Sequence, residues 1–537
     1  MTIGLTGTQP RIRALVLALA FALGLGLVAA TTQGAAAPAR AESDLPALPL
    51  RTSGNQIVAA DGRPVILQGV NWFGMETAAH APHGLWSRDY RDMLAQIAGL
   101  GFNTIRLPFS LAALRSTATS GIDYGGGRNE ELQGRTPRQV MDAVITAAGD
   151  YGLMIILDNH SQADDGFMYD LWYGQDGFTE TDWVNTWKDL ARRYRDTKNV
   201  IGFDLKNEPH GSATWGDGKA TDWRRAAERA GNAALAIAPN KLIIVEGIEG
   251  PAPGQQLDRH WWGGNLEGAA SHPVRLSVGN RLVYSPHEYG PGVHDQPWFS
   301  DPNMADILTQ RWDTGFGYLH DSNTAPILIG EFGAKNVGTD TTEGRWIRQF
   351  ANYLADKGMH WTYWSWNPNS GDTGGILTDD WTTTHPDKTA LLQDLMKRAK
   401  VNPGTGGNPG SGKNPDGTSG SPGNGPAAGS PGKVSRAKLK VTRKRGKTKY
   451  VLVARAPKSV GTSAVTGYQF RLRSKVDGNK SPWQSWRSMK FGTENGKARK
   501  TLNRLRKLPS GSKVKVQVRA VNSVGPGAKV PVKRRIR

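Results

Sequence analysis

Two short stretches of the sequence share a form that could do chemistry. Residues 200–209 read Val-Ile-Gly-Phe-Asp-Leu-Lys-Asn-Glu-Pro, and residues 326–333 read Pro-Ile-Leu-Ile-Gly-Glu-Phe-Gly. Each is an apolar run, typical of a buried strand, that ends in one glutamate, Glu208 or Glu331. An ionisable group is costly to bury without a partner, so its repeated placement here indicates a purpose. Two carboxylates presented in this way are what retaining glycoside hydrolysis requires.

Residues 42–400 have the pattern of a domain that could position both glutamates. Eight short apolar runs are separated by amphipathic stretches with a helical period. Strands that alternate with helices and are apolar throughout predict a parallel sheet. Eight of them favour a closed (β/α)₈ TIM barrel, an α/β fold, over an open sheet. The runs are residues 64–72, 104–109, 154–160, 200–208, 242–247, 282–289, 327–333 and 360–367.

The stretches between these runs complete the predicted barrel. Helices are predicted at residues 88–100, 138–151, 184–194, 222–237 and 342–357. Residues 50–65, with Asp61-Gly62 as a turn, predict a hairpin that caps the bottom of the barrel. The functional groups of such a barrel gather at the opposite end, where the strands have their C-termini.

The polar and aromatic residues at those strand ends form one candidate site. Glu331 must be ionised to act as the nucleophile, and Arg106 with the hydroxyl of Tyr289 would hold its pKa down. Glu208 must start protonated as the acid/base, which requires a drier environment near the charge of Glu331. Asn207 suits a hydrogen bond to the sugar 2-OH. The set comprises Trp72, Arg106, Asn159, His160, Asn207, Glu208, His287, Tyr289, Glu331, Trp364 and Trp366.

Simpler structural roles for single members of this set stay open. The two glutamates could form a structural ion pair, Arg106 could be a buried salt-bridge residue, and His160 could be a satisfied core histidine. The combination is harder to explain by packing than any one residue.

Tryptophans indicate a sugar ligand. Sixteen of the 18 lie between residues 43 and 400. Trp72, Trp262 and Trp364 are predicted to offer flat faces to pyranose rings. Loop tryptophans beside glycine are expected to line a groove, which would mean internal cleavage of a polymer. The loop tryptophans are Trp172, Trp215, Trp261, Trp262, Trp298 and Trp381.

The N-terminal residues 1–41 predict a secretion signal. Arg11 and Arg13 precede an apolar stretch at residues 14–30, and Ala39-Arg40-Ala41 fits a cleavage site, so the mature chain would begin at Glu42 and be extracellular. A membrane anchor is the alternative, although the apolar run is short for a span. The chain of 537 residues has no cysteine, which excludes disulfides, Cys-based metal sites and thiol nucleophiles. We expect no metal and no cofactor.

Charge divides the chain into two parts. Residues 401–537 contain 32 Lys and Arg against 3 Asp and Glu, whereas residues 1–400 contain 35 against 44. Residues 401–432 are rich in Gly, Pro, Ser and Asn and predict a flexible linker. Residues 433–537 alternate with period two, which predicts a small antiparallel β-sandwich. A positively charged domain of this kind could hold an anionic cell-wall or plant polymer, or the charge could only aid solubility.

The quoted residues resemble glycoside hydrolase family 5, and within it the bacterial endo-β-1,4-glucanases of the actinobacterial cellulase type. The resemblance covers nearly all of residues 50–395. It implies a (β/α)₈ barrel and a retaining double displacement, with Glu208 as acid/base and Glu331 as nucleophile. It gives supporting roles to Arg106, His160, Asn207, His287, Tyr289 and Trp364. The longer motifs that carry it are residues 70–74, 83–90, 103–108, 132–134, 207–210, 261–266, 364–368 and 370–375.

Two positions differ from similar cellulases, and the C-terminal residues resemble a different family. Lys206 stands where similar cellulases often carry His, and Asp158-Asn159-His160 differs around its histidine. Residues 433–537 resemble a fibronectin type III module, an immunoglobulin-like sandwich, through residues 508–522 and 525–527. The tyrosine usual in such modules is replaced by Val514, and the early tryptophan is missing near residues 451–456.

The sequence therefore predicts a secreted endo-β-1,4-glucanase that acts on β-glucan as a monomer, without specific nucleic acid and without a membrane partner after signal cleavage. One alternative keeps the fold and mechanism but changes the substrate to mannan, xyloglucan or mixed-linkage β-glucan. The other is a non-catalytic carbohydrate-binding or surface-adhesion protein.

Overall fold

The computed structural model describes residues 45–399 and, with gaps, residues 434–536. The chain divides into two compact units, Met1–Asn408 and Pro409–Arg537. The predicted signal peptide and linker lie outside the described residues. Among the helices that are described, none is long and apolar enough to cross a membrane. The gaps in the second unit are residues 445–446, 458–464, 477–478, 481–486, 490, 493–496, 503–504, 506–508, 511, 523–524 and 527–529.

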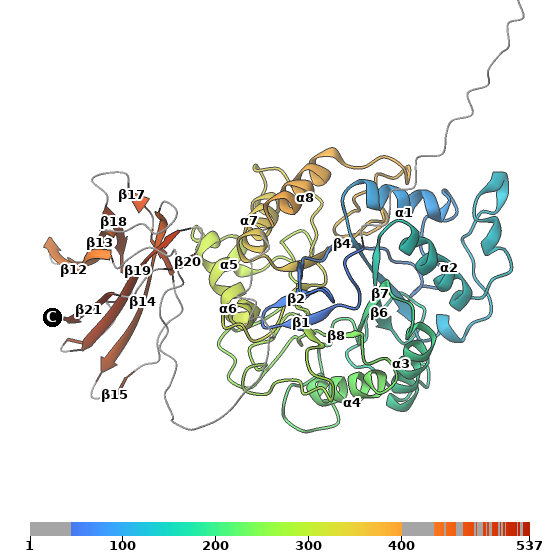
Figure 1. The fold of residues 1–537 in the computed structure, drawn as a ribbon, viewed down its shortest axis with the longest axis horizontal. Helices are drawn as coiled ribbons and strands as arrows, with labels where there is room; N and C mark the ends of the chain where they lie inside the picture. Colours follow the sequence, from blue (N-terminus) through green and yellow to red (C-terminus); the bar gives the residue numbers. More distant parts are fainter. Residues whose placement is uncertain are drawn as a thin grey trace, which may run out of the picture. The chain divides into compact units, whose positions relative to one another are not determined.

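The first unit is built around eight parallel strands (Figure 1). Along the sheet they run in the order β10, β11, β4, β5, β6, β7, β8, β9. A parallel bridge between Tyr284 and Ile327 joins the two ends of this order, so the sheet is a nearly closed barrel. The (β/α)₈ prediction is confirmed for this unit. The strands are β4 (Gln68–Asn71), β5 (Thr104–Ser110), β6 (Met154–Ser161), β7 (Val200–Asp204), β8 (Leu242–Val245), β9 (Leu282–Tyr284), β10 (Leu328–Ile329) and β11 (His360–Tyr363).

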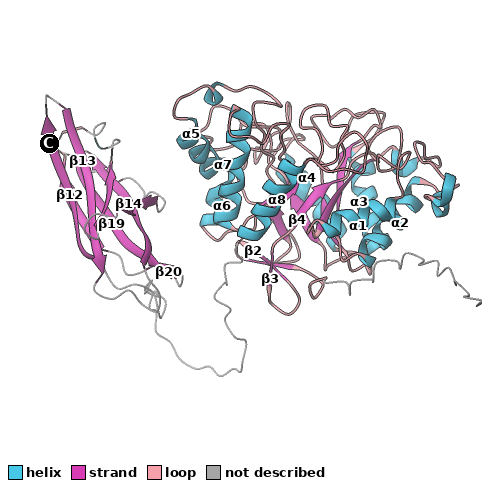
Figure 2. Ribbon diagram, turned by 90° about the horizontal axis from the view of Figure 1, so that it is seen from above, coloured by secondary structure: helices cyan, strands magenta, loops and turns pink. Residues whose placement is uncertain are grey.

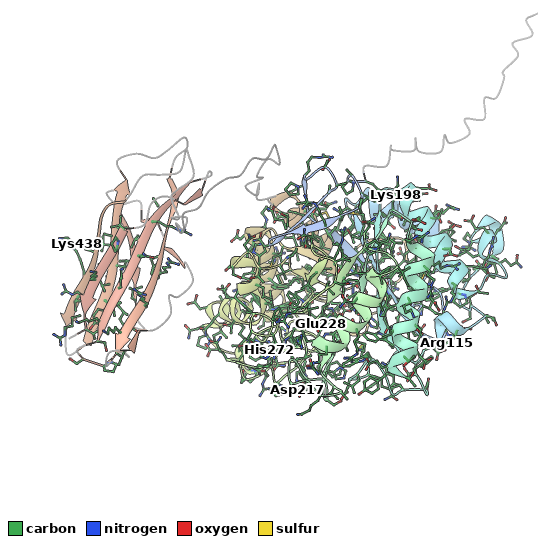
Figure 3. All side chains as sticks on the ribbon, turned by 60° about the horizontal axis from the view of Figure 1, so that its bottom comes forward. Arg115, Lys198, Asp217, Glu228, His272 and Lys438 are labelled. Atoms are coloured by element: carbon green, nitrogen blue, oxygen red, sulfur yellow. The ribbon has the colours of Figure 1, made fainter. Side chains whose placement is uncertain are left out.

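Helices surround the strands on the outside, as Figure 2 shows. Their buried faces follow the helical period of the sequence, while the outer faces carry charged side chains such as Glu228, labelled in Figure 3. The helix at Pro137–Asp150 starts with a capping box between Thr136 and Gln139. The helices are α1 (Tyr90–Gly99), α2 (Pro137–Asp150), α3 (Glu180–Tyr194), α4 (Trp223–Leu235), α5 (Met304–Trp312), α6 (Tyr318–Asp321), α7 (Thr342–Lys357) and α8 (Pro386–Arg398).

A small antiparallel sheet closes the end of the barrel where the strands begin. It consists of β1 (Arg51–Ser53), β2 (Gln56–Val58) and β3 (Pro64–Val65). Its Leu50 and Ile57 share a buried cluster with residues from the barrel strands, including Met154 and Leu242. The predicted bottom hairpin is thus present, with one strand more than expected. The opposite end of the barrel is left for the site.

The described residues of the second unit form antiparallel strands in two sheets. One has the order β12, β13, β18, β17, and the other joins β15, β14, β19 and β20, with β16 on β14 and β21 on β19. Both sheets contribute to one buried cluster, for example through Leu452 and Val516. The fibronectin type III assignment stays a prediction. The strands are β12 (Val434–Lys444), β13 (Lys447–Pro457), β14 (Val465–Val476), β15 (Asn479–Lys480), β16 (Arg487–Met489), β17 (Phe491–Gly492), β18 (Lys497–Thr501), β19 (Lys513–Asn522), β20 (Gly525–Pro526) and β21 (Val530–Arg535).

Candidate active site

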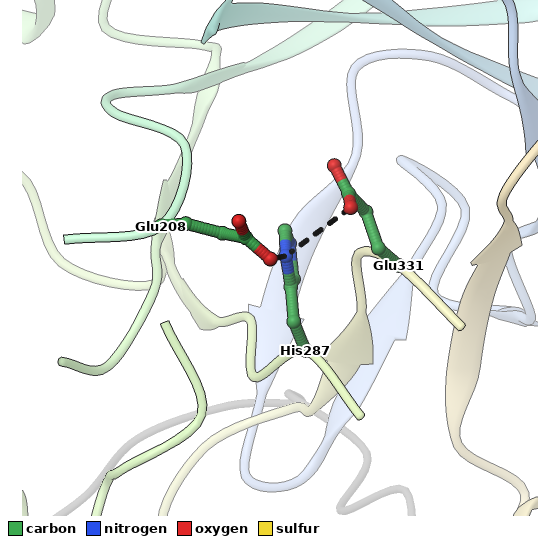
Figure 4. A group of neighbouring side chains, drawn as sticks. All are labelled: Glu208, His287 and Glu331. Atoms are coloured by element: carbon green, nitrogen blue, oxygen red, sulfur yellow. Dashed lines mark hydrogen bonds and ion pairs between the residues drawn. The ribbon is translucent and has the colours of Figure 1, made fainter. Parts of the chain in front are cut away.

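The barrel brings Glu208 and Glu331 together, with His287 between them (Figure 4). Glu208 follows the end of β7, and Glu331 follows the end of β10. Their side chains are almost fully buried. A carboxylate oxygen of one lies within 4.8 Å of a carboxylate oxygen of the other. This spacing is close to the roughly 5–5.5 Å of retaining glycosidases and well short of the roughly 6.5–9.5 Å of inverting ones.

Both oxygens of Glu331 accept hydrogen bonds that favour its ionised form. Arg106 Nη1 donates to Oε1 over 2.8 Å, and the hydroxyl of Tyr289 donates to Oε2 over 2.7 Å. Burial alone would raise the pKa of Glu331, but the charges of His287 and Arg106 hold it below its ordinary value. Glu331 is thus an anion with both oxygens fixed in position.

Arg106 has a hydrogen-bond acceptor for each of its five N–H groups. Nε donates to Asp204 at 2.8 Å. Nη1 donates to Asn71 at 3.0 Å and to Glu331 at 2.8 Å. Nη2 donates to Asn207 at 2.9 Å and to Glu246 at 3.1 Å. A guanidinium offers five donors in one plane, and here one fully buried side chain fixes acceptors from four strand ends.

The surroundings of Glu208 differ from those of Glu331. His287 Nδ1 lies 3.0 Å from Glu208 Oε1. The backbone N–H of Glu208 donates to Glu246 Oε2 over 2.7 Å. Burial raises the pKa of Glu208 above its ordinary value, and the negative charge of Glu331 acts in the same direction. The φ angle of Glu208 is 49°, a left-handed conformation that non-glycine residues rarely adopt. The neighbouring contacts therefore hold a strained backbone that aims the carboxyl at Glu331.

His287 is charged because of the carboxylates around it. Its Nε2 lies 3.2 Å from Glu246 Oε1, and its Nδ1 lies 3.5 Å from Glu331 Oε2. Burial opposes a charge on the ring, but Glu246 and Glu331 outweigh it and hold the pKa of His287 well above its ordinary value. The imidazolium thus links both glutamates to Glu246.

The side-chain amide of Asn207 uses its oxygen in a hydrogen bond, whereas its nitrogen has no partner among the described residues. Its Oδ1 accepts from Arg106, which orients the amide. Its buried Nδ2 has no hydrogen-bond acceptor among the described residues. A buried donor without a partner is costly, so this N–H points to a ligand oxygen. The observation suits the predicted contact with a sugar hydroxyl.

His160 and Trp364 lie beside each other near this centre. Their rings are parallel, with an interplanar angle of 10° and centroids 5.5 Å apart. His160 Nδ1 lies 2.7 Å from Asp158 Oδ2. Burial opposes a charge on His160, but Asp158 outweighs it and raises the pKa of His160. Trp364 is half-buried and keeps part of its surface accessible.

Comparison with known proteins identifies the family. The model of the family described as cellulase (glycosyl hydrolase family 5) matches residues 58–370, more than half of the chain. The chain belongs to glycosyl hydrolase family 5. A relative named endoglucanase from Paenibacillus polymyxa is 49% identical over 348 residues, which are 64% of this chain and 86% of that protein.

Two solved structures of endoglucanases are also similar. The catalytic domain of the major endoglucanase from Xanthomonas campestris pv. campestris is 45% identical in sequence to this chain, and the two structures superpose with a TM-score of 0.61. The match covers 65% of this chain and 100% of that domain. A cellotetraose complex of the endocellulase from Pyrococcus horikoshii is 42% identical, with a TM-score of 0.61 over 65% of this chain and 98% of that one. The family model, which matches residues 58–370, lies within the first unit.

In this family 5 barrel, Trp262 is the most accessible of the predicted sugar platforms. It is 37% exposed and stacks on His210, with centroids 3.8 Å apart and an interplanar angle of 7°. His210 in turn lies beside Glu208, because its Nδ1 is 2.7 Å from the Glu208 carbonyl oxygen. A side chain on Gly263 would collide with Glu246, since its Cβ would lie 2.4 Å from Oε2. The glycine after Trp262 therefore lets this loop approach the acidic centre.

The prediction for Trp72 is wrong. Its ring is fully buried in the barrel core, and its Nε1 donates to the carbonyl oxygen of His83 over 3.0 Å, so it presents no face to a sugar. Trp86, which is not among the predicted sugar platforms, is 41% exposed. The expectation of a tryptophan-lined groove also fails at four loop positions, because packing buries Trp172, Trp215, Trp298 and Trp381.

The family 5 site contains three buried acidic residues that sequence reasoning missed. Asp158, Asp204 and Glu246 each offer an oxygen, and these oxygens lie within 4.8 Å of one another. Arg106 contacts all three, at distances between 2.8 and 3.1 Å. A signal for them was present, because each stands inside or at the end of an apolar run, as Glu208 and Glu331 do.

Lys206, one of the departures from similar cellulases, is also fully buried. Its Nζ donates to the carbonyl oxygen of Asn207. Burial lowers the pKa of Lys206 to about 8, against the opposing effect of nearby carboxylates. Asn159, the other departure, donates to the carbonyl oxygen of Ser161 over 2.9 Å, within the C-terminal end of β6.

Proposed function

We propose that this family 5 chain is a secreted, retaining endo-β-1,4-glucanase in which Glu208 is the acid/base and Glu331 the nucleophile. The observation that carries the proposal is the pair itself. Two buried glutamates lie within 4.8 Å, and their pKa values are shifted in opposite directions. The carboxyl with the raised pKa, Glu208, suits the role of the acid, and the carboxyl with the lowered pKa, Glu331, suits the role of the anionic nucleophile.

The first half of the reaction breaks the glycosidic bond. Glu331 attacks the anomeric carbon with its ionised oxygen, while the protonated carboxyl of Glu208 gives its proton to the leaving glycosidic oxygen. The attack forms a glycosyl ester on Glu331 and releases the other part of the polysaccharide as an alcohol. Tyr289 stays hydrogen-bonded to the nucleophile and Arg106 stabilises it as an anion before attack.

The second half releases the sugar with its original configuration. Glu208, now a carboxylate, takes a proton from water as the water oxygen attacks the anomeric carbon. The ester bond breaks, Glu331 returns as a carboxylate, and Glu208 is protonated again. His287 adjoins both carboxyls, so its positive charge offsets the negative charge that moves from one to the other during the cycle. Two inversions give retention.

Several observations support β-1,4-glucan as the substrate. Relatives across the matched region are named endoglucanases, and one solved relative holds cellotetraose. The exposed ring of Trp262 and the half-buried ring of Trp364 offer apolar surface on which sugars can stack. The finer assignment, to the actinobacterial cellulase type, rests on the long motifs at residues 83–90 and 261–266. Mannan, xyloglucan or mixed-linkage β-glucan remain the alternative substrates within the same mechanism.

Two measurements test this function. Digestion of a defined cello-oligosaccharide, followed by proton NMR, should show the β anomer first, and early α anomer would overturn the retaining mechanism. Carboxymethylcellulose should lose viscosity quickly relative to the reducing ends released, as internal cleavage requires. A panel with mannan, xyloglucan and mixed-linkage β-glucan then decides the substrate. A protein that binds these polymers without cleaving them would support the non-catalytic alternative.

Secretion and the C-terminal domain belong to the same proposal. Residues 1–41 have the charge pattern and the cleavage site of a signal peptide. N-terminal sequencing of protein from culture medium should begin at Glu42. Residues 433–537 act as a fibronectin type III-like accessory domain that holds an anionic polymer. Every residue proposed to act in catalysis precedes residue 400, so removing residues 401–537 should leave hydrolysis of a soluble β-glucan nearly unchanged.

A further inference from the structure

One sheet of the C-terminal unit carries rows of positive charge across three adjacent strands. Strands β14, β19 and β21 are antiparallel neighbours, with β19 in the middle. Directly opposed residues in such a sheet have Cβ atoms about 4.5–5.5 Å apart. The register therefore brings like charges close together. Lys475, Lys513 and Arg535 form one row, and Arg473, Lys515 and Lys533 form the next.

These rows lie on the face of the sheet opposite the core. On β19 the alternate residues Val514, Val516 and Val518 are buried in the apolar cluster of this unit. Because successive side chains of a strand point to opposite faces, Lys513 and Lys515 point away from that cluster. Lys513 is exposed, and Lys515 is partly exposed.

A hollow is formed where the three strands come together at one end. Its volume is about 360 Å³. It is lined by three consecutive residues from each strand, namely 473–475, 513–515 and 533–535. Seven of these nine are Lys or Arg, and the other two are Ser474 and Val514. We call this feature the cationic hollow.

The concentration of charge is costly to the unit. Like charges directly opposite each other destabilise a sheet. Further along the same strands, burial and the nearby charge of Arg471 lower the pKa of Arg519 to about 10. Residues 433–537 contain 31 Lys and Arg but only two acidic residues, Asp477 and Glu494. The unit's own side-chain carboxylates can therefore balance only a small part of this charge, and an external polyanion would relieve the repulsion.

We propose that the cationic hollow binds a linear acidic polysaccharide through its carboxylates, that is, a polyuronate. Charge complementarity is the basis, since seven cations line the hollow and six of them form the two rows on the outer face of the sheet. None of the nine lining residues is aromatic, so the hollow has no ring on which a neutral sugar or an unpaired base could stack. The choice of a polysaccharide over another polyanion rests on the proposed extracellular endoglucanase, whose substrate is found beside acidic polysaccharides in plant material.

The test uses the full chain and polygalacturonate as the probe. Binding is measured by affinity electrophoresis and by retention on immobilised polygalacturonate over a range of salt concentrations. The variant Lys513→Gln/Lys533→Gln removes two exposed cations of the hollow. The matched control Lys438→Gln/Lys440→Gln removes two exposed cations from β12 of the other sheet, where Lys438 is labelled in Figure 3. Both variants lose the same net charge.

The hollow variant should bind polygalacturonate about thirtyfold more weakly, because each basic residue beside an anionic surface contributes roughly a factor of five. Its affinity should also depend less steeply on salt, since fewer counterions are released. The control should change by less than about threefold. Equal losses in the two variants, no retention of the parent on polygalacturonate, or tighter binding of duplex DNA than of polygalacturonate at equal ionic strength would each overturn the proposal.

Hydrolysis of a neutral soluble β-glucan is measured in parallel. Both variants should keep the parent's rate, because the substituted lysines lie outside the barrel. If the parent binds polygalacturonate through the hollow but does not cleave β-glucan, the binding proposal stands and the proposed function fails. If the parent cleaves β-glucan but is not retained by the acidic polymer, the reverse holds.

Discussion

Replacement of Glu246 by Gln should slow the reaction although Glu246 contacts no reacting atom. Its carboxylate accepts from the Glu208 backbone N–H at 2.7 Å and from Arg106 at 3.1 Å, and it lies 3.2 Å from His287 Nε2. Glutamine keeps the shape and one acceptor oxygen but loses the charge, so at least one charge-assisted hydrogen bond is lost. Such a bond contributes about 1.5–3 kcal/mol. Expressed in the transition state, this loss lowers kcat/KM about 10- to 150-fold.

The pH profile shows how the loss acts. The negative charge of Glu246 raises the pKa of His287, so in Glu246→Gln the imidazole is neutral over more of the working range. The charge of His287 is also what holds the pKa of Glu331 down. Without it the pKa of Glu331 rises, and the acid limb of kcat/KM, which reports ionisation of the nucleophile, moves to higher pH.

Two variants serve as controls for this prediction. Glu246→Asp keeps the charge but shortens the reach to the Glu208 N–H, so its acid limb should stay near that of the parent while kcat/KM falls. Glu228→Gln removes a carboxylate that pairs with Arg224 on α4, outside the site, and should stay within twofold of the parent. Thermal unfolding of each variant should show a cooperative transition near that of the parent. A folded Glu246→Gln with kcat/KM within twofold of the parent and an unmoved acid limb would refute the reasoning.

Four further outcomes are expected. Glu331→Ala should lower kcat by at least about 10⁴-fold with the fold intact by circular dichroism, because no other group can form the glycosyl ester. Glu208→Gln should slow hydrolysis about 10²–10⁴-fold and remove the basic limb of the pH profile, since the pKa of Glu208 lies above its ordinary value and deprotonation of this acid sets that limb. Trp262→Ala should weaken cello-oligosaccharide binding about 2- to 12-fold by calorimetry, as expected for loss of one stacking contact. Gly263→Ala should lower the free energy of unfolding by about 1–2 kcal/mol in urea titrations, because φ there is 67° and the new Cβ would crowd Glu246.

The barrel could be predicted from the sequence because its strands are fully buried. Each of the eight apolar runs overlaps one barrel strand, as residues 154–160 overlap β6. The first run, residues 64–72, is divided between β3 and β4, because the chain passes there from the small bottom sheet into the barrel. Both sheets bury apolar side chains, so the pattern of hydrophobicity does not show where one sheet ends and the next begins.

The aromatic lining was harder to predict than the glutamates. The sequence alone does not distinguish a tryptophan in the core from a tryptophan in a sugar-binding groove. Only the packing in the folded protein shows which of the two a given tryptophan is. Trp172 contacts Trp183 and Trp223 in an aromatic cluster, whereas Trp262 lies on His210 and keeps much of its surface open. The polar residues at the strand ends were easier, because the topology of a parallel barrel brings all such ends to one rim.

The cost of burying a carboxylate also singles out Glu246 in the sequence. The apolar residues 242–245 are followed directly by this glutamate, so their run presents a carboxylate at its end as the runs of Glu208 and Glu331 do. Burial is equally costly for the carboxylate of Asp204 inside its strand. What the sequence could not show is that one arginine would serve all of these acids, since the partners lie up to 225 residues apart along the chain.

That sharing explains how Glu331 stays ionised in so acidic a site. Arg106 contacts Asp158, Asp204, Glu246 and Glu331, and four full negative charges around one guanidinium would repel each other strongly. Burial raises the pKa of Asp204 well above its ordinary value, and the nearby charge of Glu246 adds to this effect against that of Arg106. The shifts of these acids thus run in opposite directions, because the pKa values of Asp158 and Glu331, which also contact Arg106, are held below their ordinary values against the effect of burial. The positive charge of Arg106 therefore favours the ionised form of the nucleophile.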